Sequence, residues 1–259
     1  EKLATRLLDP ERSLPLHIAV IAVVALANRF SDPAPVAMAT LHGTGIGDIP
    51  ETMTVMTWNI GYAGMGADSD FFLDKGQQWR PPDATMVDEN LTAIAAELSR
   101  QGADIVMVQE SARPSLLTYG RDVMASVRDA MVNYAWMFSA EANTRLIPRP
   151  WGVQVGNVVL TRFTGGRGER RALPQEPNRK LGIFRKQYRM HILRHGDWTF
   201  INIHLSTFDT AQHDVRRKQV AALLEFAQAE YAKGHRVVIG GFPAQHRAGI
   251  PVLDTRFSA

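Results

Sequence analysis

The chain has 259 residues, of which 45% are hydrophobic and 21% are charged, a balance that is typical of a globular protein and excludes a disordered one. It contains no cysteine, which excludes a disulfide scaffold, a thiolate zinc site and a cysteine nucleophile. The net charge is +3. Lysines and arginines gathered between residues 162 and 194 would suit a phosphate-bearing ligand, but such runs more often only keep a surface soluble.

Residues 14–27 form the most apolar stretch of the chain. The stretch is too short for a straight transmembrane helix, which needs about 20 residues, but it fits the core of a secretory signal or the remnant of an anchor. We therefore expect residues 1–30 to be a targeting or anchor-like segment, and residues 31–52 to be a linker. This predicts an exported or membrane-anchored protein with possible membrane association through its N-terminus. If the stretch is an ordinary packed helix instead, the protein is cytoplasmic.

Residues 53–259 have the pattern of one domain. A β-branched run predicts a strand at 54–59, followed by a glycine-rich loop. Apolar spacing and Gly102 predict a helix from residue 83 or 88 to about residue 100. A strand at 104–110 and a helix at 120–131 come next.

From residue 134 onward the pattern changes to strands separated by turn signals, which predicts hairpins and antiparallel neighbours. The expected strands are 134–139, 153–162, 168–173, 183–194 and 197–204; a helix at 211–232 and a strand at 236–239 come after them. The fold class that this order predicts is α/β (α+β), with two mainly antiparallel sheets covered by helices.

Three of the expected strands end in a polar residue. Asn59, Glu110 and His204 each come after an apolar run, whereas the last strand runs into Gly240-Gly241. A carboxylate in that position is unfavourable unless it is paired or binds a cation, and with an amide oxygen nearby it suits Mg²⁺ better than zinc. An imidazole can stabilise or protonate a phosphate oxygen. Each residue taken alone is more often a salt-bridge partner, a turn cap or a hydrogen-bonded histidine.

Taken together and in order, five segments resemble motifs of the endonuclease/exonuclease/phosphatase superfamily, over about residues 52–241. They are Met56-Thr57-Trp58-Asn59-Ile60-Gly61, Asp104-Ile105-Val106-Met107-Val108-Gln109-Glu110, Gly156-Asn157-Val158-Val159-Leu160-Thr161-Arg162, Asn202-Ile203-His204-Leu205 and Val237-Val238-Ile239-Gly240-Gly241. The loop from Tyr62 to Gly76 resembles that of a bacterial, often exported or membrane-anchored, branch.

The resemblance implies a four-layer α/β sandwich and hydrolysis of a phosphoester, with Mg²⁺, or Mn²⁺ in its place, as cofactor. It implies that Glu110 is the main metal ligand. Asn59 is expected to support the metal or its bound water and to take part in catalysis. His204 is expected to bind and polarise the phosphate. Arg216 and Gln219, in the helix after Asp209, match an Arg-x-x-Gln pattern and are expected to orient the His204 loop.

The match breaks at residue 242. The family has Gly-Asp-x-Asn where this chain has Gly241-Phe242-Pro243-Ala244, and it continues to a late Asp-His pair that this chain does not contain. We therefore expect residues 242–259 to be an atypical tail, and the sandwich to be incomplete at its C-terminal end. A truncation or frameshift near codon 241 explains this better than a genuine pseudoenzyme. Little or no hydrolase activity is expected, because loss of general-base groups lowers rates about 10²–10⁴-fold.

Two other functions stay open. The domain could be a non-catalytic module that holds phosphate ligands, or a nucleic-acid-binding protein, although the chain lacks aromatic residues interleaved with the basic ones. The substrate of an active enzyme would be a nucleic acid, a phospholipid or an inositol phosphate, because the motifs serve the phosphate and not the group attached to it. No obligate protein partner is evident.

Overall fold

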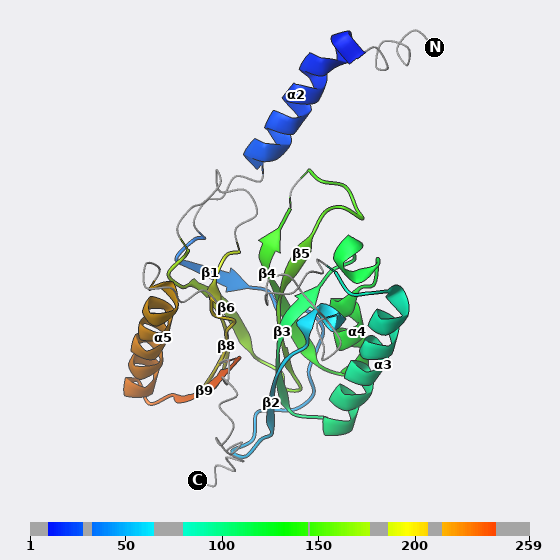
Figure 1. Cartoon of the computed structure of the whole chain (residues 1–259). Helices are drawn as coiled ribbons and strands as arrows, with labels where there is room; N and C mark the ends of the chain where they lie inside the picture. The colour runs from blue at the N-terminus through cyan, green and yellow to red at the C-terminus, as the bar shows by residue number, and fades with distance from the viewer. Residues whose placement is uncertain are drawn as a thin grey trace.

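The computed structural model of the chain describes residues 10–27, 33–64, 80–144, 146–176, 186–206 and 214–241. Two sheets face each other (Figure 1). One has the order β1-β6-β7-β8-β9, made of Val36–Ala39, Arg167–Ala172, Arg189–His195, Trp198–Asn202 and Arg236–Gly240. The other has the order β2-β3-β5-β4, made of Val55–Asn59, Ile105–Ala112, Gln154–Thr161 and Ala135–Asn143.

Each sheet contains one parallel pair, and its other pairs are antiparallel. The parallel pairs are β2 with β3 and β8 with β9. In both pairs a helix connects the two strands: α3 (Ala84–Gln101) precedes β3, and α5 (Val215–Ala232) precedes β9. The prediction of two mainly antiparallel sheets is therefore confirmed.

Helices cover the outer face of each sheet, which makes four layers (Figure 1). α3 and α4 (Val123–Ala130) pack on the four-stranded sheet, while α5 packs on the other. The strand β3 shows how alternation builds these layers. Its residues Val106 and Val108 belong to the core beneath α3 and α4, whereas Ile105 and Met107 belong to the core between the sheets.

Local sequence signals set the limits of α3 as expected. The side chain of Asp83 accepts a hydrogen bond from the backbone N–H of Met86, and Gly102 ends the helix in the left-handed conformation with φ 53°. These are the usual N-cap and C-terminal devices of a helix. The boundaries predicted from Asp83 and Gly102 are therefore confirmed.

Several strands differ from their expected limits: β7 begins at Arg189 and not at residue 183, and β3 continues to Ala112. Val36–Ala39, inside the segment expected to be a linker, forms the edge strand β1 and pairs with β6. The expected strand 134–139 continues to Asn143, because β4 keeps its pairing with β5 beyond an irregularity between Ala140 and Ala142. This longer β4 brings Glu141 into the sheet. The tail 242–259 lies outside the described residues.

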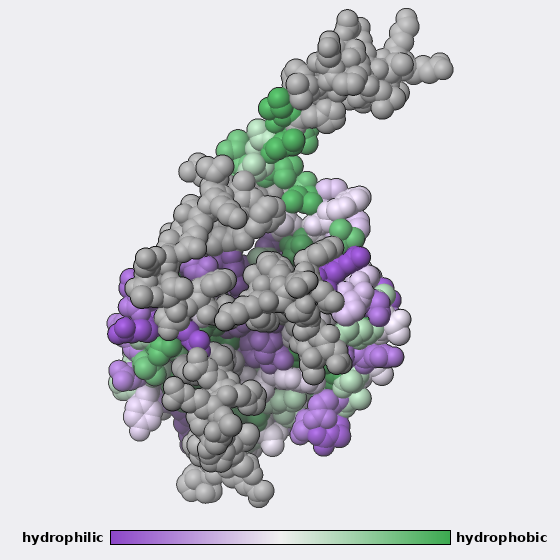
Figure 2. All heavy atoms as spheres, viewed as in Figure 1, coloured by the Kyte–Doolittle hydropathy of each residue, from purple (hydrophilic) through white to green (hydrophobic). Residues whose placement is uncertain are grey.

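The N-terminal apolar stretch lies in α2 (Pro10–Ala27). Its apolar side chains are largely exposed: Ile18 by 56%, Ile21 by 67% and Leu26 by 67%. Figure 2 shows them as a green band on a helix that projects from the sandwich. No helix in the described part of the chain has the length and apolar character needed to cross a membrane.

Candidate active site

Polar residues from both sheets meet at one edge of the sandwich. The carboxyl ends of parallel neighbours lie at the same edge, so pairing of β2 with β3 brings Asn59 beside the end of β3. Pairing of β8 with β9 brings Asn202 level with Gly240. Across the two sheets, Nε2 of His204 lies 3.1 Å from Oε1 of Glu110, and Asn59 is close enough to help lower the pKa of the Glu110 carboxyl. The three polar residues that the sequence singled out are therefore brought together.

Glu110 adopts an unusual backbone conformation. Its φ is +57°, and the register between β3 and β5 shifts between Val108 and Ser111. For a residue with a β-carbon this left-handed conformation costs about 1–2 kcal/mol. The backbone N–H of Glu110 donates to Oδ1 of Asn157, 3.3 Å away. Backbone strain of this kind is found mostly where a side chain must be aimed at a functional site.

A buried amide pair joins the two sheets just beneath Glu110. Asn202, on β8, donates to the backbone oxygens of Val108 and Val158 at 3.1 Å and 3.0 Å. Its own Oδ1 accepts from Nε2 of Gln109 at 2.6 Å. Because buried amides are stable only when they are hydrogen-bonded, this pair fixes the spacing between β3 and β8. It thereby fixes the distance between Glu110 and His204.

A second carboxylate, which the sequence pattern did not single out, lies at this edge. Glu141, on β4, is fully buried, and its Oε2 lies 3.0 Å from Nζ of Lys186 and 3.5 Å from Nδ1 of His204. A signal for it existed: Glu141 comes after Met137 and Ser139 at intervals of two residues, and all three are buried. Alternation along a strand places them on one face. The predicted strand stopped at residue 139, so this alternation did not reach Glu141.

Asn157 links the two carboxylates. Its Nδ2 lies 2.8 Å from Oε1 of Glu141 and 3.2 Å from Nε2 of His191, while its Oδ1 accepts from the backbone of Glu110. Asn157 stands in one of the five motifs, but the sequence alone did not indicate its role. One amide therefore holds the backbone of Glu110 and the carboxylate of Glu141 in fixed positions.

The charges in this cluster stabilise one another. Burial alone would raise the pKa of Glu110 and Glu141, but His204 and Lys186 outweigh it, so both pKa values lie below the ordinary range. Burial likewise opposes the charged form of His204, yet the hydrogen bonds to both carboxylates raise the pKa of its imidazole. His191 differs, because burial dominates and lowers its pKa. The cluster thus holds two carboxylates, a lysine, a histidine that is readily protonated and a neutral histidine.

The proton positions on His204 depend on its contacts. Nζ of Lys186 lies 2.6 Å from Nδ1 of His204. When the imidazole is neutral, Nδ1 accepts from Lys186 and the proton lies on Nε2; when it is charged, both nitrogens carry protons, and Nδ1 no longer accepts from Lys186 but faces Oε2 of Glu141, 3.5 Å away, as a donor. In both forms Nε2 carries a proton and donates toward Glu110. His204 therefore acts as a hydrogen-bond donor at this edge.

The expected supporting residues lie in different places. Gln219 is buried on α5: its Oε1 accepts from the backbone N–H of Ser206 at 2.8 Å, and its Nε2 donates to the backbone oxygen of Pro174 at 2.8 Å. It thus contacts the segment just after His204. Arg216 is half-buried on the same helix. Asp209 lies outside the described residues.

The residues at this edge fit a hard divalent cation. Among the described residues, no group of three or more His, Asp or Glu is arranged to hold a metal ion. Mg²⁺, however, is usually held by only one or two carboxylates with water completing its shell. Glu110 offers one such carboxylate, 13% exposed. Oδ1 of Asn59 accepts from the backbone of Gly61 at 3.0 Å and keeps a second lone pair.

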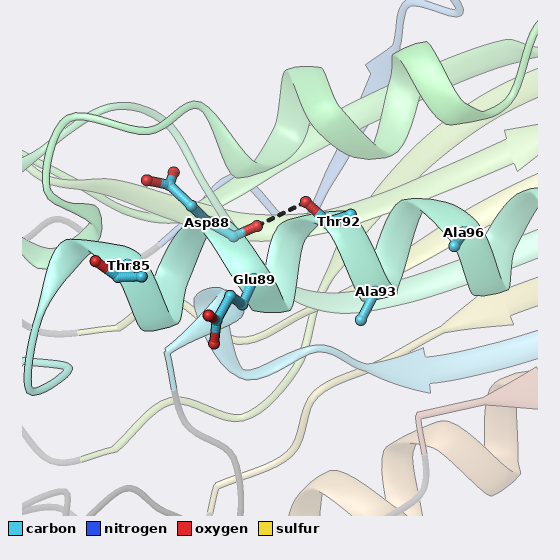
Figure 3. A pocket seen from close by; sticks show the side chains of 6 residues that line it. All are labelled: Thr85, Asp88, Glu89, Thr92, Ala93 and Ala96. Atoms are coloured by element: carbon cyan, nitrogen blue, oxygen red, sulfur yellow. Dashed lines mark hydrogen bonds between the residues drawn. The ribbon is translucent and has the colours of Figure 1, made fainter.

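A hollow on the outer side of α3 is unrelated to this cluster. Figure 3 shows that all the side chains that line it come from that one helix. Asp88 is paired with Arg121 at 2.5 Å, and its backbone oxygen accepts from Thr92. The hollow is lined by Thr85, Asp88, Glu89, Thr92, Ala93 and Ala96. No second helix or strand contributes to its lining, and the lining side chains do not gather hydrogen-bond donors around one point.

The fold and this edge together define an α/β sandwich with an acid, amide and imidazole cluster. The sequence matches no protein-family model and no curated protein. Among solved structures, an endonuclease/exonuclease/phosphatase from Beutenbergia cavernae DSM 12333 is similar, with 23% identity, a TM-score of 0.45, and coverage of 68% of this chain and 44% of that one. ANGEL2, a 2′,3′-cyclic phosphatase, has 14% identity, a TM-score of 0.46, and coverage of 81% and 56%.

An endonuclease/exonuclease/phosphatase family protein from Leptotrichia buccalis C-1013-b is also similar, with 10% identity, a TM-score of 0.38, and coverage of 67% of this chain and 60% of that one. The chain spans about half the length of the first two proteins.

Proposed function

We propose that this chain is the domain of a metal-dependent phosphoester hydrolase, with its reaction centre at Glu110 and His204. The observation that carries the proposal is the 3.1 Å contact between these two side chains. A carboxylate and an imidazole donor reach each other from opposite sheets, at an edge where the backbone of Glu110 is strained to aim its side chain. A group that binds the metal and a group that binds the phosphate must lie close together to act on the same phosphate.

The described residues divide into three roles. Glu110 and Asn59 would hold Mg²⁺ or Mn²⁺, which when bound polarises a phosphate oxygen and favours formation of hydroxide from water. His204 would donate the proton on Nε2 to a phosphate oxygen as negative charge develops there. Glu141 and Lys186 act through His204 by fixing its ring and its protonation, so both are positioning residues.

We further propose that the hydrolysis rate is reduced in this chain. Gly241 is followed by Phe242 where a Gly-Asp-x-Asn sequence would supply an acid. Gly240 itself packs tightly between the sheets, since a β-carbon there would lie 2.6 Å from Cε of Met107 and 2.8 Å from Oγ1 of Thr57. The end of β9 thus lies at the same edge as Asn59 and Asn202. The residue that comes after Gly241, however, is apolar.

Turnover of bis(p-nitrophenyl) phosphate with added Mg²⁺ tests both parts of the proposal. The wild-type chain is expected to turn over slowly, and the double substitution Phe242→Asp with Ala244→Asn is expected to raise the rate about 10²-fold or more. Glu110→Gln in the double variant should remove the gain. No turnover in the double variant, or a rate that Glu110→Gln leaves unchanged, would contradict the proposed reaction centre.

A non-catalytic phosphate-binding module is the second candidate, and Phe242 favours it. Titration of the wild-type chain with a phosphodiester and Mg²⁺ separates the two functions. Binding that depends on Mg²⁺ and on Glu110, with no turnover in either the wild type or the double variant, would support the module and exclude the hydrolase.

A further inference from the structure

Two arginines lie on the inner face of the five-stranded sheet, beside the reaction centre. Arg170, on β6, is directly opposite His191, on β7, and Arg189 precedes His191 by two residues. Residues so placed share one face of a sheet. His191 faces the other sheet, because its Nε2 lies 3.2 Å from Nδ2 of Asn157 and 3.8 Å from Oε1 of Glu141. Arg170 and Arg189 therefore face the space between the sheets.

Neither guanidinium pairs with a carboxylate of the described residues. Arg170 donates to the backbone oxygen of Met38 at 3.2 Å. Arg189 donates to the backbone oxygen of Ala140 at 2.9 Å and to the side-chain oxygen of Gln187. The arginines on the outer face of the same strands differ: Arg171 and Arg194 lie 3.1 Å and 2.7 Å from Glu169.

One donor of this pair has no partner. Nε of Arg170 is buried and has no hydrogen bond within the part of the chain that the structure describes. A buried N–H of a charged group without an acceptor is more unfavourable than a neutral one. An acceptor with negative charge would satisfy it, and a guanidinium offers its donors in a fork that matches phosphate.

The surroundings leave this charge unbalanced. Burial lowers the pKa of Arg189 and the charge of Arg170 lowers it further, while Glu141 acts in the other direction. Glu141 is already paired with Lys186 at 3.0 Å. His191 is neutral because burial lowers its pKa. Two half-buried cations therefore stand together beside a carboxylate that another cation neutralises.

We propose that Arg170 and Arg189 form a subsite for a second anionic phosphate of the substrate. The subsite rests on the proposed function, and it narrows the substrate to esters that carry two phosphates. Arg189 contacts Ala140, which directly precedes Glu141, so the subsite adjoins the reaction centre. The second phosphate could belong to a nucleic acid or to a phosphorylated inositol headgroup, because both present anionic phosphate oxygens to the guanidinium groups.

Binding measured by calorimetry at fixed salt tests the subsite with two pairs of probes. One pair is thymidine 3′,5′-bisphosphate and thymidine 5′-monophosphate; the other is inositol 1,4-bisphosphate and inositol 1-phosphate. The wild-type chain is expected to bind the bisphosphate at least about tenfold more tightly than the monophosphate in one pair, since charge-assisted contacts are strong. The pair with the larger ratio identifies the source of the phosphate.

Arg170→Gln and Arg189→Gln are each expected to bring that ratio close to one. Arg189→Lys, which keeps the charge but loses the fork, should give an intermediate ratio. Arg167→Gln is the matched control, because Arg167 is exposed and lies on the other face of β6; it should leave the ratio unchanged. Thermal unfolding of each variant verifies that it is folded.

A wild-type ratio near one in both pairs would overturn the subsite, as would an equal fall of the ratio in Arg167→Gln. Turnover tests the proposed hydrolase function separately from the subsite. If no variant turns over bis(p-nitrophenyl) phosphate but the bisphosphate preference is present and lost in Arg189→Gln, the subsite stands and the hydrolase is excluded. If turnover is present without the preference, only the subsite is excluded.

Discussion

Glu141 and Glu230 are both buried glutamates with similar partners, yet they lie in different regions of the molecule. Glu141 has Lys186 at 3.0 Å and His204 at 3.5 Å. Glu230, on α5, has Lys233 at 2.8 Å, His235 at 3.2 Å and Arg194 at 3.0 Å. A buried carboxylate with a histidine and a lysine is therefore present twice, once at the edge of the sandwich and once behind the five-stranded sheet.

The contacts of the two histidines distinguish the two clusters. His204 contacts Glu110 on the opposite sheet, where the backbone is strained and an amide pair fixes the spacing. His235 contacts Oγ1 of Thr199 at 3.1 Å and Glu230 itself. The cluster around Glu230 joins α5 to the outer face of the five-stranded sheet, where Arg194 also lies 2.7 Å from Glu169, whereas the cluster around Glu141 leads through His204 to Glu110 at the strand ends. Residue types alone do not distinguish a reaction centre from a structural ion network; the placement at the strand ends does.

Among the substitutions considered, Glu141→Gln should have the largest effect, which is on turnover. It also separates the cluster around Glu141 from the cluster around Glu230 most clearly. We expect turnover to fall about 10³-fold, equal to about 4 kcal/mol, because His204 loses the carboxylate that orients its ring. The measurement is kcat for bis(p-nitrophenyl) phosphate in the Phe242→Asp and Ala244→Asn background. Glu230→Gln is the matched control and should leave kcat unchanged. Equal losses in the two variants would mean that the two clusters do not differ in function.

Asn202→Ala removes the amide pair that spaces the two sheets. It leaves the backbone oxygens of Val108 and Val158 and the amide of Gln109 without their partner. Each buried group left unsatisfied costs about 1–3 kcal/mol, and we expect the free energy of unfolding to fall by about 3 kcal/mol in total. Denaturant unfolding measures it. A loss below about 1 kcal/mol would show that these contacts do not hold the sheets together.

Glu230→Gln should reduce stability in a pH-dependent way. Burial opposes ionisation of Glu230, but Arg194 and Lys233 outweigh it and lower the pKa from 4.5 to about 2. A carboxyl whose folded pKa is depressed stabilises the fold above its unfolded pKa, and this stability is lost as the pH falls through the folded value. The full shift corresponds to about 3 kcal/mol, and screening of Lys233 and Arg194 by solvent reduces that contribution.

Because Gln keeps some of the hydrogen bonds around Glu230, we expect a loss of about 2 kcal/mol at pH 7. Unfolding measured in urea between pH 2 and pH 7 should show that the wild type loses stability as the pH falls from 4.5 to about 2, while the variant has a flatter profile. Parallel profiles would show that Glu230 does not carry this acid sensitivity.

Arg170→Gln should have the smallest effect on stability, since it relieves repulsion from Arg189 while it removes one contact with Met38. We expect a change within about 0.5 kcal/mol in either direction. The informative measurement is the rise of Tm on addition of a bisphosphate, which should be present in the wild type and absent in the variant. A loss of stability above about 2 kcal/mol would indicate a purely structural arginine.

The sequence by itself indicated most of the elements, although not β1, and three of the candidate site residues. Asp83 and Gly102 set the limits of α3 through backbone hydrogen bonds that depend only on local chemistry. Glu110 could be singled out because a carboxylate after a buried apolar run is unfavourable without a partner, and Asn59 and His204 because each ends an expected strand within a motif that resembles the family. Two mainly antiparallel sheets covered by helices could be predicted from the order of strands and helices, whereas the four layers were implied by the family resemblance.

Only the tertiary structure brought Glu141, Lys186 and Asn157 into this cluster. Glu141 belongs to a strand that continues past its expected end because β5 offers it partners, and that pairing is non-local. Arg170 and Arg189 lie in a basic stretch that suited either a phosphate-bearing ligand or a soluble surface, and the register of β6 with β7 turns these two inward and turns Arg171 and Arg194 outward. Strand register is set by long-range pairing, so the sequence could indicate basic residues but not which of them face the space between the sheets.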